Sequence, residues 1–101
     1  MFHLLNVDSL THVQNGFPRG EVDRMADAMI TLGCNLQPVI VAKGGYSEAK
    51  GDFEYEVLGN HLVAAAAQQA RLLKPREWEM VHCYIVEKTD SITAIDIQMS
   101  M

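Results

Sequence analysis

The sequence predicts a single α/β domain in which a small mixed sheet carries two main helices. Apolar residues recur at helical spacing in segment 21–32, and segment 62–73 is rich in alanine, the strongest helix former. Short runs of β-branched or alternating residues lie before, between and after these segments. A chain of 101 residues is long enough to bury one core and too short for two, so residues 1–101 form one domain.

Composition and charge narrow the class of protein. Hydrophobic residues make up 49% of the chain and charged residues 21%, as in a packed globular domain. The net charge of -5 repels nucleic acid phosphates and acidic membrane surfaces. No stretch approaches the ~20 apolar residues of a membrane helix, and Met1–Leu4 lacks the features of a signal peptide. We therefore expect a cytoplasmic protein with no membrane partner.

The first half of the chain predicts a strand, a loop and a helix. A short apolar run, His3–Val7, indicates a strand that ends in a turn. The segment Gln14–Gly20 contains two glycines and a proline, which favours an exposed loop that carries Arg19. Glu21–Leu32 has a helical apolar face, and Gly33 is a typical helix terminator.

A hairpin is predicted next. Gln37–Pro38 requires extended backbone, and the β-branched run Val39–Val41 that follows indicates a buried strand. Phe53–Val57 alternates apolar and acidic residues with a period of two. We expect these strands to pair across a polar loop, Lys43–Asp52.

The second helix and the last strand follow. Leu62–Leu73 is rich in alanine, the strongest helix former, and Pro75 prevents its continuation. Trp78–Val86 is dense in β-formers and indicates a strand. The tail, residues 89–101, carries apolar residues at helical spacing and predicts the start of a helix.

The candidate site is the turn Gly59-Asn60-His61, between the predicted hairpin and the second helix. A sharp turn into a helix leaves backbone N–H groups unpaired at the positive end of the helix dipole, and such a place attracts anions. We expect Gly59 to adopt a positive φ and His61 to donate a further hydrogen bond to a phosphate oxygen. The alternative is an N-cap by Asn60 with His61 exposed to solvent.

Three segments resemble motifs of the ParB/sulfiredoxin superfamily, in the same order and at similar spacing. Asn15 with Pro18-Arg19 resembles its first box. Leu32-Gly33 followed by Gln37–Val41 resembles its second segment. Tyr55–Ala65 resembles its glycine motif, and the resemblance extends from about Leu4 to Val86.

The resemblance implies a compact α/β domain that binds nucleotide phosphates with Mg²⁺, as CTP in partition proteins and ATP in sulfiredoxins. Carried over by position, Gly59, Asn60 and His61 form the phosphate cradle, Arg19 is a charge partner, and Gln37 lies near the base or ribose. The implied function is a nucleotide- or phosphate-binding module that acts in DNA partition or regulation through partners. A helical DNA-reading segment follows this domain in partition proteins, so we expect no sequence-specific DNA binding by this chain alone.

Two departures from the family pattern matter. Leu62 stands where the family has an arginine, so a main charged clamp on the phosphates is missing. Asn60 stands at the position of the reactive cysteine of sulfiredoxin and cannot act as that nucleophile. The alternative function is therefore a degenerate, non-catalytic interaction module that has lost nucleotide binding and binds a protein partner or a second copy of itself. The apolar surface for this contact is expected at Leu62-Val63 or at Met99 and Met101.

No catalytic or metal-binding residue is predicted. Cys34 and Cys83 belong to no CxxC pair and to no cluster of basic residues, so we expect both to be buried, unreactive side chains. Glu54 and Glu56 lie on one face of a predicted strand and have the chemistry to bind a divalent ion. The alternative is a solvated strand face.

Overall fold

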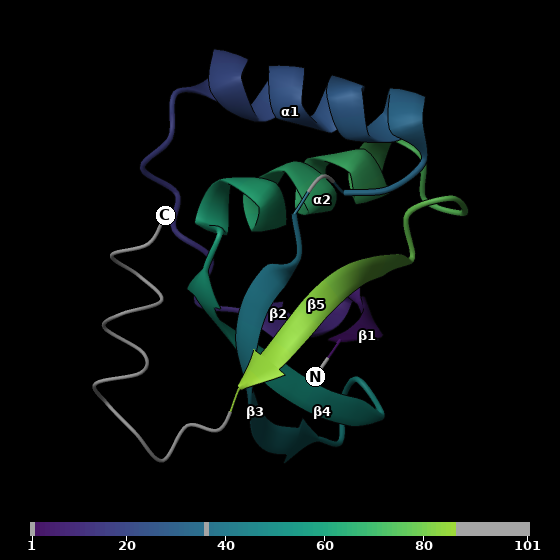
Figure 1. Cartoon of the computed structure of the whole chain (residues 1–101). Coiled ribbons are helices and arrows are strands. Elements are labelled where there is room, and N and C mark those ends of the chain that lie inside the picture. Colours follow the sequence, from purple (N-terminus) through teal and green to yellow (C-terminus); the bar gives the residue numbers. More distant parts are fainter. Residues whose placement is uncertain (1, 36, 87–101) are drawn as a thin grey trace.

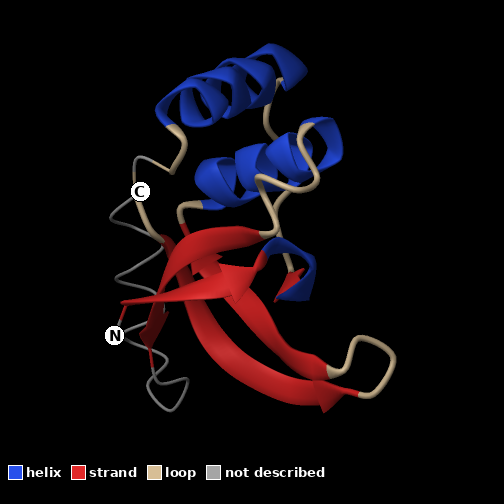
Figure 2. Cartoon of the chain, turned by 90° about the vertical axis from the view of Figure 1, so that its right-hand side faces the viewer, coloured by secondary structure: helices blue, strands red, loops and turns tan. Residues whose placement is uncertain are grey.

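Helix α2 lies between helix α1 and a five-stranded sheet, as Figures 1 and 2 show from two directions. This computed structural model describes residues 2–35 and 37–86, and the tail 89–101 lies outside the described residues. The helices and strands, in chain order, are β1 (Phe2–Asn6), the 3₁₀ turn η1 (Val7–Ser9), β2 (Leu10–Thr11), α1 (Arg19–Leu32), β3 (Val39–Ser47), β4 (Asp52–Gly59), α2 (His61–Leu73) and β5 (Met80–Val86).

The sheet is mixed, as predicted, with the strand order β1-β5-β3-β4-β2. Strands β1 and β5 are antiparallel, as are β3 and β4. Strand β5 returns parallel to β3, and β2 runs parallel to β4. The predicted hairpin is therefore confirmed, with Val41 opposite Val57.

The alanines of α2 explain its central position. Ala64, Ala66, Ala67 and Ala70 are all fully buried in the hydrophobic core. Small side chains let α1 approach α2 on one side while the sheet approaches on the other, because less volume separates the backbones. Alternate residues of β3 and β5, such as Val39 and Val81, point toward the helices and complete this core.

The predicted loop Lys43–Asp52 is too long. Strand β3 continues to Ser47, and only residues 48–51 turn. The strand pairing is irregular after Lys43 and resumes with Tyr46 opposite Phe53. The rings of these two residues pack edge to face, with their centroids 5.2 Å apart. This aromatic pair stabilises the extension, which the polar and glycine-rich sequence of the segment does not indicate.

The ends of other elements also differ from the prediction. The prediction omitted β2 because two residues are too short for a periodic signal, although Leu10 pairs with Tyr55. Helix α1 begins at Arg19, because Pro18 fixes the backbone at its N-cap. The last strand begins at Met80 and not at Trp78, which lies just before β5 with its side chain buried in the core.

Candidate functional site

One residue, Asn60, connects β4 to α2. Its backbone is left-handed, with φ 58° and ψ 46°. The prediction assigned this conformation to Gly59 and was wrong: Gly59 pairs with Ile40 in the sheet, and the described glycines with positive φ are Gly33 and Gly51. Asparagine tolerates the left-handed region better than most residues do, so the turn reverses at position 60 instead.

The Asn60 side chain ties the turn to the segment before β3. Its Nδ2 donates to the backbone oxygen of Pro38 at 2.7 Å, and it forms no side-chain cap on α2. The alternative prediction of an N-cap by Asn60 is therefore wrong. The carboxamide instead fixes the distance between the start of α2 and residues 37–38.

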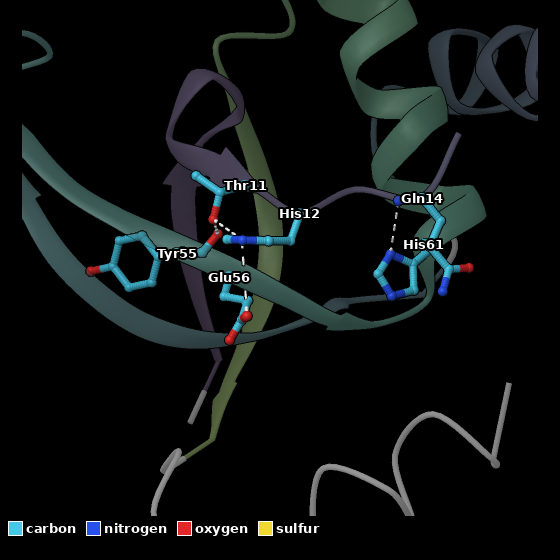
Figure 3. A network of polar contacts seen from close by, with 6 residues as sticks. All are labelled: Thr11, His12, Gln14, Tyr55, Glu56 and His61. Carbon is cyan, nitrogen blue, oxygen red and sulfur yellow. Dashed lines mark hydrogen bonds and ion pairs between the residues drawn. The ribbon is translucent and has the colours of Figure 1, made fainter. Parts of the chain in front are cut away.

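His61 is the first residue of α2 and is only 4% exposed. Its Nδ1 accepts a hydrogen bond from the backbone N–H of Gln14 at 3.2 Å, as Figure 3 shows. The neutral ring therefore carries its proton on Nε2. Desolvation by burial lowers the pKa of His61. The solvated histidine of the alternative prediction is thus contradicted, and the ring holds the loop before α1 in place.

Backbone donors remain available at the start of α2. The N–H of Ala64 donates to the oxygen of Asn60 at 3.1 Å and begins the helical ladder. Within residues 2–35 and 37–86, the N–H groups of His61, Leu62 and Val63 donate to no acceptor. Together with the positive end of the helix dipole, these amides form a place suited to an anion.

A cavity of about 330 Å³ lies between the loop before α1, the first turn of α1 and the outer face of α2. Four carboxamide side chains line it: Gln14, Asn15, Gln68 and Gln69. Phe17 adds an aromatic ring to the lining. Arg19 lies at the exposed rim, where its Nε is 3.9 Å from Oδ2 of Asp23. Gln14 links the two features, because its backbone binds His61 and the residue also lines the cavity.

Gln37 lies at the other side of the turn. Its backbone oxygen accepts from Nδ2 of Asn35 at 2.6 Å, and its neighbour Pro38 accepts from Asn60. Gln37 itself is exposed. The structure thus brings Gly59, Asn60, His61 and Gln37 to one turn and its supporting segment, whereas Arg19 lies at the cavity.

Comparison with known proteins identifies the fold. No protein-family model and no curated protein matches this sequence. A crystal structure of the C-terminally truncated chromosome-partitioning protein ParB from Caulobacter crescentus, complexed with CTP-γ-S, superposes with a TM-score of 0.66 at 16% identity, over 96% of this chain and 49% of that chain. This chain has a ParB-like fold.

A second structure of that protein, complexed to the centromeric parS site, gives a TM-score of 0.60 at 20% identity, over 94% of this chain and 44% of that chain. The ParB-like fold here therefore spans about half the length of these two chains. No helix among the described residues is long and apolar enough to cross a membrane.

Two residues that support the turn of this ParB-like fold were not predicted from the sequence. Gln14 reaches His61 through its backbone, which no side-chain pattern reveals. Asn35 is buried, and it donates to the oxygen of His82 at 3.1 Å while its Oδ1 accepts from the N–H of His82 at 3.1 Å. A lone asparagine between a helix and a strand resembles any turn residue, so no sequence signal distinguishes it.

The two cysteines differ. Cys83 is buried as predicted, and desolvation by burial raises its pKa to about 12. Cys34 is exposed just after α1, so its predicted burial is wrong: Gly33 ends the helix there and carries the chain outward. In the part of the chain that the structure describes, no three His, Cys, Asp or Glu side chains gather as metal ligands would.

Proposed function

We propose that this chain is a ParB-like module that binds a nucleotide or phosphate group at the start of α2, and that it acts in DNA partition or regulation through partners in the cytoplasm. The observation that carries the proposal is the set of backbone N–H groups at His61, Leu62 and Val63, which find no acceptor within the described residues. The fold adds support, because a ParB of similar fold was crystallised with CTP-γ-S.

The phosphates would contact backbone, with the turn residues holding that backbone in place. Gly59 and the left-handed Asn60 direct the chain into α2, so the free amides converge on one point. His61 contributes its amide, while its buried ring positions Gln14 beside the ligand. This arrangement replaces the predicted contact between the His61 ring and a phosphate.

The cavity would hold the base of the nucleotide. Carboxamides both donate and accept hydrogen bonds, so Gln14, Asn15, Gln68 and Gln69 suit the polar edge of a base such as that of CTP or ATP. Phe17 provides a ring for stacking. Arg19 at the rim would act as a charge partner, and Gln37 as a polar contact on the opposite side of the turn.

Mg²⁺ would arrive with the phosphates. Magnesium commonly takes its ligands from substrate phosphates and water with one or two carboxylates. The described residues offer no cluster of three acidic or histidine ligands, and this is compatible with such a phosphate-held ion.

Leu62 predicts weak affinity. It follows His61 in the first turn of α2, where the resemblance leads us to expect an arginine. A charged hydrogen bond is worth about 1.5–3 kcal/mol, and its absence lowers affinity about ten- to a hundredfold.

Calorimetric titration with CTP, ATP and GTP in the presence of Mg²⁺ tests this function. We expect Leu62→Arg to tighten binding at least tenfold, because it adds a cation beside the free amides. Leu62→Glu should abolish binding, because a carboxylate there repels phosphate and competes for the amides. Leu32→Arg adds the same charge at the far end of α1 and serves as the control. Flat titrations at millimolar nucleotide for both the natural protein and Leu62→Arg would reject the proposal.

The second candidate function is an interaction module without a nucleotide. Exposed apolar side chains on the sheet favour it: Phe2, Leu4 and Met80 are 70%, 53% and 41% exposed. Of the surface expected at Leu62-Val63, Val63 is buried in the core and Leu62 is half-buried. Met99 and Met101 lie outside the described residues. The nucleotide titration separates the two candidates, because only the first one predicts binding.

A further inference from the structure

Strand β1 forms one edge of the sheet, and at its end the Asn6 side chain donates to Oδ2 of Asp52 at 3.3 Å. The opposite edge, β2, has only two residues and offers little to another strand. No strand in the described parts of the chain pairs with the outer side of β1. The five residues Phe2–Asn6 include no proline and no Lys, Arg, Asp or Glu, which are the residues that usually prevent one edge strand from pairing with another.

The hydrogen-bond pattern shows which groups of β1 face outward. The N–H of Val7 donates to the oxygen of Glu79 at 2.9 Å, and this pair continues the register in which Leu5 faces Val81. Hydrogen-bonded pairs alternate along an antiparallel ladder, so His3 and Leu5 direct their backbone groups toward β5. The N–H and C=O groups of Phe2, Leu4 and Asn6 therefore point away from the sheet.

The side chains of the same three residues lie on the sheet face away from α1 and α2. Phe2 and Leu4 sit opposite Tyr84 and His82, while the neighbouring Val81 and Cys83 face the core. The rings of Phe2 and Tyr84 meet edge to face at 4.8 Å. Outward backbone groups and an exposed apolar row thus occur on the same strand.

We propose that β1 pairs with β1 of a second copy of this chain, antiparallel about a two-fold axis at Leu4. This register makes the Leu4 amide of each copy donate to the Leu4 carbonyl of the other, and the Asn6 amide donate to the Phe2 carbonyl. The reciprocal bond runs from the Phe2 amide to the Asn6 carbonyl, which also accepts from the Ser9 hydroxyl at 2.6 Å and has a lone pair for each donor. The result is one continuous sheet through both copies.

A second copy fits this edge because the strand is complementary to itself. Under the two-fold axis Leu4 faces Leu4, Phe2 faces Asn6 and His3 faces Leu5, so no two acidic or basic side chains oppose each other. A five-residue strand buries less than the roughly 800 Å² per partner of a standard interface, so we expect a weak dimer with a Kd in the micromolar range.

Charge-swap variants at the axis test the proposal by sedimentation velocity. The natural protein should shift from monomer to dimer as its concentration rises. Leu4→Lys and Leu4→Glu should each remain monomeric, because each places like charges face to face. An equimolar mixture of the two should dimerise again, which also shows that both variants are folded. Leu32→Lys is the control, since Leu32 is 59% exposed on α1 and should leave dimerisation unchanged.

Amide hydrogen exchange gives an independent measurement on the unmodified protein. The amides of Leu4 and Asn6 should exchange slowly at high protein concentration and rapidly after dilution, whereas the Leu5 amide should exchange slowly at both. A monomer up to millimolar concentration, or a dimer that both Leu4 variants preserve when tested singly, would overturn the proposal. Neither result depends on nucleotide, so this inference and the proposed nucleotide site succeed or fail separately.

Discussion

The backbone N–H of Gln14 donates to the imidazole Nδ1 of His61 across a separation of 47 residues, at 3.2 Å. This bond joins the loop before α1 to the first residue of α2. It requires a neutral ring, because a protonated imidazole has no acceptor at Nδ1. The link therefore depends on pH.

Acidification should destabilise the fold through His61. Burial lowers the pKa of this ring in the folded protein below its ordinary value of 6.5. The stabilising contribution is therefore present above pH 6.5 and is lost as the pH falls through the lowered pKa. Urea unfolding between pH 7.5 and pH 5 should show a decreasing free energy of unfolding.

His61→Asn is the matched control for that experiment. An asparagine oxygen can accept from the Gln14 amide, and it does not titrate in this range. The variant should lose the His61 part of the pH dependence while the remaining groups titrate as before. An unchanged pH profile in His61→Asn would show that His61 does not cause the effect.

Replacing Asn60 should separate backbone strain from the side-chain bond. Asn60→Ala places an alanine in the left-handed region and removes the bond to Pro38, which together cost about 2–3 kcal/mol. Asn60→Gly removes the same bond but relieves the strain, so it should cost less than the alanine variant. Urea unfolding of both variants measures the difference, and equal losses would contradict a role for backbone conformation.

The two thiols should react at very different rates. Cys34 is exposed, whereas Cys83 is buried and its pKa is raised to about 12. A disulfide reagent at pH 8 should therefore modify one thiol of the folded protein rapidly, and both after denaturation. In Cys34→Ser the rapid phase should disappear. Rapid modification of that variant under native conditions would show that β5 opens readily.

The sequence predicts well what arises from short-range patterns. Helical spacing identifies the first helix and alanine content the second, and Gly33 and Pro75 mark where they stop. The position of the turn at residues 59–61 is also correct, because a strand pattern there changes directly into a helix pattern. The predicted mixed sheet with two helices is also confirmed, because it follows from the same short-range patterns.

Interactions between distant residues account for what the sequence did not predict. The burial of His61 depends on the loop at Gln14, and the pairing of Tyr46 with Phe53 extends β3 through a segment that reads as loop. The left-handed residue moved from Gly59 to Asn60 because the sheet pairs with Gly59. Each of these outcomes is decided by a partner that local sequence does not specify.

The carboxamide of Asn35 imitates a peptide group. It offers His82 one donor and one acceptor, as main chain in a ladder would, and so it extends the sheet by one rung where no strand is present. The backbone at Gln37 and Pro38 is thereby released from pairing with β5 and is free to meet Asn60. One side chain thus decides whether this stretch belongs to the sheet or supports the turn at Asn60.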